Sequence, residues 1–215
     1  MQEGGLYYRP IEIRNDRLWD PISNAPMSTA FAISRFFIPH LVPQGGTALF
    51  MDCDMLARAD INRLFDEADP AMAISVVKHR HEPHEGIKMD GQIQTAYPRK
   101  NWSSVMLWNL DHPAHRHLTL KYLNTVPGRF LHAFGWLMDS EIGDLHPGWN
   151  HLVGVNDPDE FAKLVHFTLG IPRMHGYENC EHSAEWWDYA TRLGLVNPAA
   201  NAIADPEPAW QIPQR

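Results

Sequence analysis

The sequence predicts an α/β protein with a mixed, mainly parallel sheet flanked by helices, as in Rossmann-like folds. Short apolar runs with strand character alternate along the chain with segments of helical periodicity. One of these runs is apolar on both of its faces and ends in two acidic residues. Such a run is typical of a central parallel strand, whose carboxyl end opens into a crevice where ligands bind.

The run that organises the rest of the chain spans residues 47–56 and contains Asp52 and Asp54. Residues at positions i and i+2 of an extended chain share one side, so both carboxylates can converge on a hard divalent cation. Such a cation can neutralise a diphosphate leaving group, as the use of a nucleotide-activated donor requires. Two solvated acids at a strand end are the other interpretation, and the short motif alone leaves both open.

The segment before this strand is expected to contain an irregular arm and one helix. Residues 1–27 hold several prolines among charged residues and predict an arm with at most one short strand. Ser28 can cap a helix that ends near Ile38, before Pro39. Arg35 lies within this helix, either as a surface charge or beneath the acidic strand end.

The rest of the chain is expected to continue the alternation of strands and helices. We predict helical turns at 59–65, a strand at 71–78, a long polar loop at 79–94, a strand at 105–109, helices at 119–124 and 128–138, an acidic stretch at 139–144, a strand at 163–167 and a helix at 183–193. Residues 28–196 therefore form one expected domain, followed by a Pro/Ala/Asn-rich tail at 197–215.

Composition narrows the class of protein. The chain has 215 residues, of which 44% are hydrophobic and 20% charged, which are globular values. The formal charge of −8 disfavours a broad nucleic-acid-binding surface. The two cysteines make neither a zinc spacing nor a disulfide framework, as expected in a reducing compartment. Without a signal-peptide pattern or a stretch of ~20 apolar residues, we expect a soluble, cytoplasmic protein.

Five groups of residues, taken in order, resemble motifs of the GT-A glycosyltransferases, specifically family eight with its galactosyltransferase and glycogenin relatives. They are Ser34-Arg35-Phe36; Leu49 to Leu56 with Asp52 and Asp54; Asn101-Trp102-Ser103-Ser104-Val105-Met106-Leu107; Asp139-Ser140-Glu141 with Trp149-Asn150; and His166-Phe167-Thr168 followed by Gly170 and Pro172. The resemblance covers roughly residues 28–190.

The resemblance implies a GT-A fold and metal-dependent transfer of a sugar from a nucleotide-sugar. A UDP-linked hexose is the first expectation for the donor, with retention at the anomeric carbon by front-face substitution. The acceptor stays open between a glycan, a lipid-linked saccharide, a protein and a modified nucleobase. Asp52, Asp54 and His166 would hold Mn²⁺ or Mg²⁺.

The resemblance also names candidates for the donor site. Asp139 and Glu141 are the candidate catalytic carboxylates, placed to bind hydroxyls of the donor sugar. The donor-binding candidates are Arg35, Asp52, Lys88, Asn101, Ser103, Ser104, Gly170 and Arg173.

The sequence departs from the family pattern at its start. It is similar to a short form that lacks the usual first β-α-β unit, which holds the nucleotide base, so a second subunit in a homo-oligomer is one way to complete the pocket. Ser104 also stands where the family has Gly. The missing unit suggests a catalytically weakened or inactive GT-A-fold binding module as a second function. A nucleotidyltransferase, with a similar sheet and metal-binding carboxylates, is a third. Such an enzyme usually carries a Gly-rich basic loop, which Gly4-Gly5 alone does not make.

Overall fold

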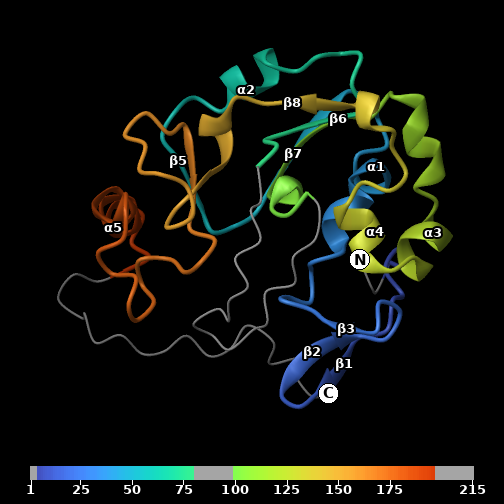
Figure 1. Cartoon of the computed structure of the whole chain (residues 1–215), viewed down its shortest axis with the longest axis horizontal. Coiled ribbons are helices and arrows are strands. Elements are labelled where there is room, and N and C mark those ends of the chain that lie inside the picture. The colour runs from blue at the N-terminus through green and yellow to red at the C-terminus, as the bar shows by residue number, and fades with distance from the viewer. Residues whose placement is uncertain (1–3, 80–98, 197–215) are drawn as a thin grey trace.

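The computed structural model describes residues 4–79 and 99–196, and Lys88 and the tail at 197–215 lie outside this part of the chain. The described residues form small sheets with helices around them (Figure 1). The strands are β1 (Glu12–Arg14), β2 (Arg17–Asp20), β3 (Ala25–Pro26), β4 (Thr47–Met51), β5 (Met55–Ala57), β6 (Ile74–Val76), β7 (Val105–Asn109), β8 (Ile142–Asp144), β9 (His151–Leu152) and β10 (Leu164–His166). The α-helices are α1 (Ile38–Leu41), α2 (Asn62–Asp66), α3 (Leu120–Thr125), α4 (Gly128–His132) and α5 (Ser183–Arg192), and the 3-10 helices are η1 (Ser34–Phe37), η2 (Trp102–Ser104), η3 (Pro113–His117), η4 (Asp139–Glu141) and η5 (Pro147–Asn150).

The main sheet has the strand order β4-β7-β6-β8. β7 pairs antiparallel with both β4 and β6, whereas β6 and β8 are parallel. The mixed α/β class is therefore confirmed, but the expected mainly parallel arrangement and the central place of residues 47–51 are wrong. Among the described strands, β4 lies at an edge of this sheet. An apolar run predicts burial but not the direction of the neighbouring strand, which pairs from far along the sequence.

A second sheet, ordered β5-β10-β9, completes the region around the candidate site. Its middle strand β10 is antiparallel to β5 and parallel to β9, with His166 opposite Met55 on one side and Leu152 on the other. Residues 52–54 link β4 to β5 and so connect the two sheets. Both β5 and β9 are too short to give a periodic signal, and the sequence did not predict them.

The N-terminal segment is not irregular, contrary to the expectation for residues 1–27. β1, β2 and β3 form an antiparallel sheet of their own, at the bottom of Figure 1. The buried Arg9 anchors it: its guanidinium donates to both oxygens of Asp20 and to the backbone carbonyls of Leu123 and Val126. These contacts join the segment to α3 and to the turn after it.

Two predicted helices have different bounds in the structure. The segment expected to be helical over residues 28–38 becomes helical only at Ser34, and Pro39 lies in the first turn of α1 rather than ending a helix. Proline is tolerated there because the first N–H groups of a helix have no intrahelical acceptor. The helix expected over 128–138 ends at His132, because Phe134 adopts a left-handed φ of 52°.

Both faces of the main sheet are buried. Alternate residues of β7 point to opposite faces, so Met106 and Trp108 belong to one hydrophobic cluster and Val105 and Leu107 to another. The first cluster includes side chains of η1, α3 and α4, and Trp108 stacks on Trp136 with ring centroids 6.0 Å apart. None of the helices in the described ranges has the length and apolarity to cross a bilayer.

Candidate metal centre

Asp52, Asp54 and His166 converge where the two sheets meet. One ligand atom from each lies within 4.8 Å of the others, and His166 Nε2 is 3.4 Å from Asp54 Oδ1. His166 is buried, whereas the side chains of Asp52 and Asp54 are 21% and 35% exposed. The carboxylates are thus held from the protein side and remain accessible from solvent.

A chain of hydrogen bonds fixes the tautomer of His166. The Ser104 hydroxyl donates to the Asn101 carbonyl over 2.7 Å and therefore accepts from Asn150 Nδ2 over 2.9 Å. This orients the fully buried Asn150 amide so that its oxygen faces His166 Nδ1 at 3.1 Å. Nδ1 therefore carries the proton of the neutral ring and leaves the Nε2 lone pair for a cation, whereas in the absence of a cation a proton on Nε2 lets the ring pair with Asp54. An outer partner that fixes the ring of a ligating histidine in this way is a recurrent feature of metal sites.

Arg35 holds Asp52 in place. Its Nη2 is 2.9 Å from Asp52 Oδ1, and its Nη1 donates to Asp52 Oδ2 over 3.3 Å. The remaining donors reach the backbone carbonyls of Ser103 and Ala32, and the guanidinium lies over the Phe50 ring. These contacts position the Asp52 carboxylate, and the predicted contact of Arg35 with the donor stays a prediction.

The two carboxyl groups have opposite pKa shifts. Burial raises the pKa of Asp52, and the neighbouring Asp54 carboxylate acts in the same direction, against the opposing effects of Arg35 and His166. Burial also acts on Asp54, but the hydrogen bond and charge of His166 outweigh it and lower its pKa. Two carboxylates and a neutral imidazole nitrogen form a donor set that fits Mn²⁺ or Mg²⁺, with further positions open to ligand oxygens.

Two predicted donor-binding residues, Ser103 and Ser104 of η2, hold Asp52 and Arg35 through their backbone carbonyls. Ser103 and Ser104 are buried, and the Ser104 carbonyl accepts from the Asp52 backbone N–H over 2.9 Å. The Ser103 hydroxyl contacts His132 Nδ1 at 2.8 Å. Burial and the nearby Arg35 charge lower the pKa of His132 to about 3, so this imidazole is neutral at physiological pH. Asn101 contributes its backbone carbonyl to the chain of hydrogen bonds described above.

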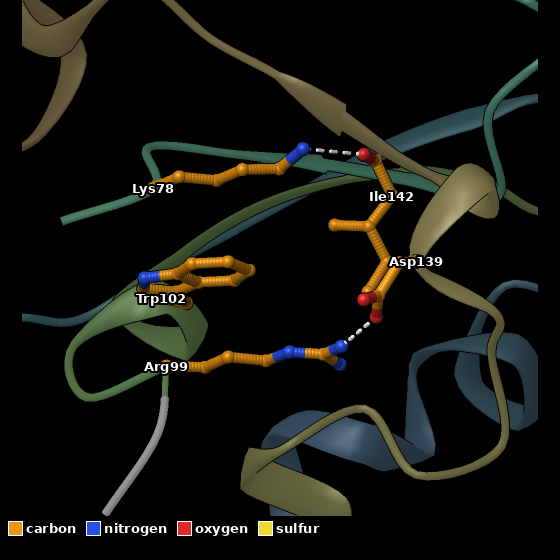
Figure 2. Close-up of a pocket in the computed structure, with 5 residues that line it drawn as sticks. All are labelled: Lys78, Arg99, Trp102, Asp139 and Ile142. Carbon is orange, nitrogen blue, oxygen red and sulfur yellow. Dashed lines mark hydrogen bonds and ion pairs between the residues drawn. The ribbon is translucent and has the colours of Figure 1, made fainter. Parts of the chain in front are cut away.

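A pocket of about 150 Å³ lies beside η2 and contains one of the two predicted catalytic carboxylates (Figure 2). Asp139 lines it together with Lys78, Arg99, Trp102 and Ile142. Asp139 forms an ion pair with Arg99, and Lys78 Nζ donates to the Ile142 carbonyl over 2.8 Å. The pocket therefore offers an aromatic face, a carboxylate and two cations.

Glu141, the second predicted catalytic carboxylate, has a different task. Its Oε2 accepts from the Met138 backbone N–H over 2.7 Å and caps the turn η4. It does not line the pocket that contains Asp139. The structure thus separates the two acids that the sequence analysis had paired.

Comparison with known proteins gives one relative and several similar structures. No family model matches the chain. It is 46% identical over 164 residues to Protein CDI of Arabidopsis thaliana, an overlap of 74% of this chain and 63% of that protein. The chain therefore spans less than two thirds of this relative.

The similar solved structures are glycosyltransferases. The galactosyltransferase LgtC in complex with donor and acceptor sugar analogues aligns with a TM-score of 0.53 at 14% identity, covering 91% of this chain and 74% of LgtC. The apo bifunctional glycosyltransferase WbbM aligns with a TM-score of 0.52 at 16% identity, covering 77% of this chain and 36% of WbbM. The fold is GT-A. At these identities the likeness establishes the architecture alone.

Within the GT-A fold, the remaining predicted site residues lie after β10 or outside the described ranges. A Cβ atom added at Gly170 would lie 2.6 Å from a ring carbon of Tyr177, so this glycine permits close packing of the ring. Arg173 is exposed. Lys88 is not among the described residues, and its predicted donor contact stays a prediction.

Sequence reasoning missed several residues of the site. Asn150 orients His166, Arg99 pairs with Asp139, and Trp102 forms a wall of the pocket. A signal existed for Asn150, because it stands in the Trp149-Asn150 pair that is part of the sequence resemblance. Arg99 gave no signal, since its partner lies 40 positions along the chain.

Proposed function

We propose that this chain is a metal-dependent glycosyltransferase that transfers a hexose from a UDP-linked donor to an acceptor, with retention. The observation that carries the proposal is the convergence of Asp52, Asp54 and His166 at the meeting point of two sheets in a GT-A fold. The acceptor class stays open between glycans, lipid-linked saccharides, proteins and modified nucleobases.

The residues around the centre have distinct tasks in this proposal. A bound Mn²⁺ or Mg²⁺ would neutralise the diphosphate leaving group. Asp52 and Asp54 present carboxylate oxygens, and His166 presents Nε2 because Asn150 holds the proton on Nδ1. Arg35 keeps Asp52 in its orientation through both carboxylate oxygens.

The pocket beside η2 supports a place for the donor sugar. Trp102 offers a flat apolar surface of the kind on which sugar rings stack, and Asp139 can accept hydrogen bonds from hydroxyl groups. Arg99 positions Asp139, and Glu141 is engaged as a cap.

The direct test measures UDP release from a panel of UDP-sugars, in the presence of Mn²⁺ and of a chelator, without added acceptor. We expect slow hydrolysis of one UDP-hexose that requires the metal and is lost in Asp54→Asn. Chelator-resistant hydrolysis, or equal hydrolysis by Asp54→Asn, would contradict the metal assignment. No hydrolysis of any UDP-sugar by a folded protein that also fails to bind UDP would contradict the donor assignment.

A second candidate is a GT-A-fold binding module with little or no catalysis. In this candidate Asp52 and Asp139 stay in their ion pairs with Arg35 and Arg99 when ligands bind, whereas in the first candidate the same pairs orient the two acids toward the metal and the donor. Calorimetry combined with the UDP-release assay separates the candidates, because both would bind Mn²⁺ and UDP but only the enzyme would turn over a donor.

A further inference from the structure

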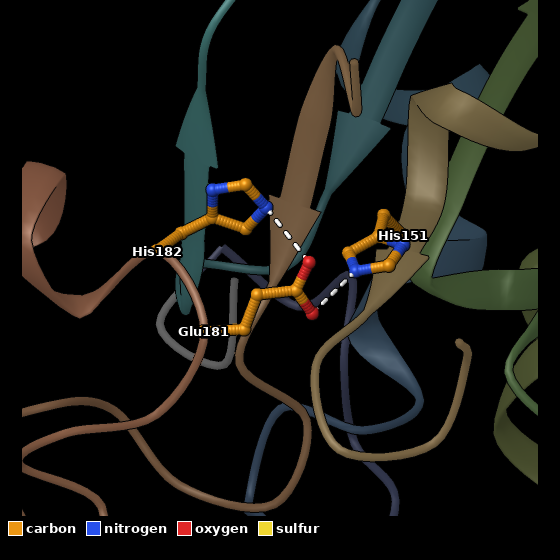
Figure 3. A group of neighbouring side chains, drawn as sticks. All are labelled: His151, Glu181 and His182. Carbon is orange, nitrogen blue, oxygen red and sulfur yellow. Dashed lines mark hydrogen bonds and ion pairs between the residues drawn. The ribbon is translucent and has the colours of Figure 1, made fainter. Parts of the chain in front are cut away.

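A second cluster of metal-ligating side chains lies outside the centre described above. Glu181 is placed between two imidazoles: its Oε2 is 2.9 Å from His151 Nε2, and its Oε1 is 3.1 Å from His182 Nε2 (Figure 3). One ligand atom from each residue lies within 4.8 Å of the others. Both imidazoles thus direct the same ring nitrogen at one carboxylate.

The cluster is built into the protein. The side chains of His151 and His182 are 4% and 7% exposed, and that of Glu181 is 21% exposed. His151 begins β9, whereas Glu181 and His182 directly precede α5. His182 adopts a left-handed φ of 59°, which is uncommon for a residue of its size and places its ring opposite His151.

Outer contacts support one tautomer of His182. Its Nδ1 lies 3.5 Å from Glu185 Oε1, and the other oxygen of Glu185 accepts from Arg58 Nε over 2.8 Å. In the cation-free cluster His182 Nε2 donates to the Asp159 backbone carbonyl over 3.2 Å, because a carbonyl oxygen only accepts. When a cation takes the place of this proton, the Glu185 carboxylate favours the remaining ring proton on Nδ1.

We propose that His151, Glu181 and His182 form a second metal site, selective for a borderline cation of the Zn²⁺ class. Two imidazole nitrogens and a carboxylate oxygen are a frequent zinc donor set, and tetrahedral bonds of about 2.0 Å place neighbouring ligand atoms about 3.3 Å apart. The two imidazole nitrogens lie 2.9 and 3.1 Å from different oxygens of Glu181, and one ligand atom from each of the three residues lies within 4.8 Å of the others, so small side-chain movements would bring the three groups around one cation. The first centre has two carboxylates and one imidazole, which suits harder cations.

The position of this site indicates a structural role. A cation there would tie the segment before α5 to β9, and His151 directly follows Asn150, which orients His166. His182 contacts Glu185, and Glu185 in turn accepts a hydrogen bond from Arg58, which directly follows β5. The second site would therefore fix the backbone of strands on both sides of β10.

The test is Zn²⁺ binding by the full chain after chelator treatment and removal of any affinity tag. The background is Asp54→Asn, which removes a ligand of the first centre. In this background we compare Glu181→Gln with the charge-matched control Glu178→Gln, which removes a half-buried neighbouring acid whose contacts are with Gly176 and His175 rather than with the cluster. Gln at position 181 is isosteric and can still accept the Asp159 backbone N–H, which is now 2.8 Å from Oε1.

We expect one Zn²⁺ per chain, with a Zn²⁺-dependent rise in Tm, in the Asp54→Asn background and in its Glu178→Gln variant. Glu181→Gln should weaken the affinity at least about 100-fold, since even outer partners of ligands contribute 10–100-fold. If Glu181→Gln is unfolded, His151→Gln serves in its place. A chain that binds no Zn²⁺, or binds it equally well after Glu181→Gln, would show a hydrogen-bonded cluster without a metal and overturn the proposal. The readout is independent of glycosyl transfer, so it stands apart from the proposed function.

Discussion

Two arginine–aspartate pairs in this molecule have similar forked geometry and opposite electrostatic outcomes. Arg9 and Asp20 are almost fully enclosed, with side chains 0% and 2% exposed, whereas Arg35 and Asp52 are 10% and 21% exposed. Burial opposes ionisation of Asp20, but hydrogen bonds from Arg9 and Ser23 outweigh it and lower its pKa. Burial raises the pKa of Asp52 despite Arg35.

The difference lies in what surrounds each carboxylate. Asp20 accepts hydrogen bonds from Arg9, from the Ser23 hydroxyl and from the Ile22 backbone N–H, so its charge is fully compensated. Asp52 has Arg35 on one side and a second carboxylate, Asp54, on the other. A compensated charge anchors the fold, while an incompletely compensated one leaves a place for a cation.

The largest expected effect is a loss of glycosyltransferase activity when the carboxylate next to the Arg35–Asp52 pair is changed. Asp54→Asn should reduce metal-dependent UDP release by about 10²–10³-fold, the scale of losing one group that stabilises developing charge. Its unfolding free energy should stay within about 1 kcal/mol of wild type, because the group is partly exposed. Asp66→Asn, at an exposed position, is the charge-matched control. Normal turnover in Asp54→Asn would remove Asp54 from the centre.

The largest effect on stability is expected at the enclosed pair. Arg9→Met should lower the unfolding free energy by about 3–5 kcal/mol, because it leaves the Asp20 carboxylate buried without its partner. Urea unfolding measures this, with Arg14→Met as the control, since Arg14 pairs with Glu12 at the surface and should matter by less than about 1 kcal/mol. Equal effects in the two variants would contradict the contrast between the pairs.

A conservative change tests whether Arg35 acts by positioning Asp52. Arg35→Lys keeps the charge but cannot reach both oxygens of Asp52 in a fork, so we expect a 10–100-fold loss of UDP release and weaker Mn²⁺ binding. The loss of stability should be smaller than in Arg9→Met. Wild-type activity with lysine would show that charge alone suffices there.

The smallest expected effect is a change in the pH dependence of stability. The folded-state pKa of Asp20 is lowered, so its stabilising contribution is complete above the ordinary pKa of 3.8 and is lost as the pH falls through the folded value. Asp20→Asn should therefore show a shallower loss of unfolding free energy than wild type below about pH 4. Parallel curves for the two proteins would contradict this assignment.

Elements with a strong local signal could be predicted from the sequence, and those that depend on distant partners could not. β7 and α5 have apolar patterns over five and ten residues, and their predicted bounds lie within a residue of the observed ones. β9 has two residues and exists only because β10 lies beside it. The antiparallel pairing of β4 with β7 also depends on a strand far along the chain, so the sequence pattern did not predict it.

The candidate site likewise has features that the sequence predicted and features that it could not predict. The residue types and order of Asp52, Asp54 and His166 predicted a group that the structure brings together, although its role as a metal centre stays a prediction. The tasks of Arg35, Ser104 and Glu141 depend on contacts with residues far along the chain or on a local cap. Residue type and spacing do not report such contacts.

The geometry of the candidate metal centre depends on the register of β10, because β10 pairs with β5 on one side and with β9 on the other. His166 lies between Asp54, which directly precedes β5, and Asn150, which directly precedes β9, and side chains alternate along a strand. A slip of one residue would offer Val165 or Phe167 to Asp54 and turn the imidazole to the opposite face. Insertions and deletions within the strand itself are therefore expected to be excluded.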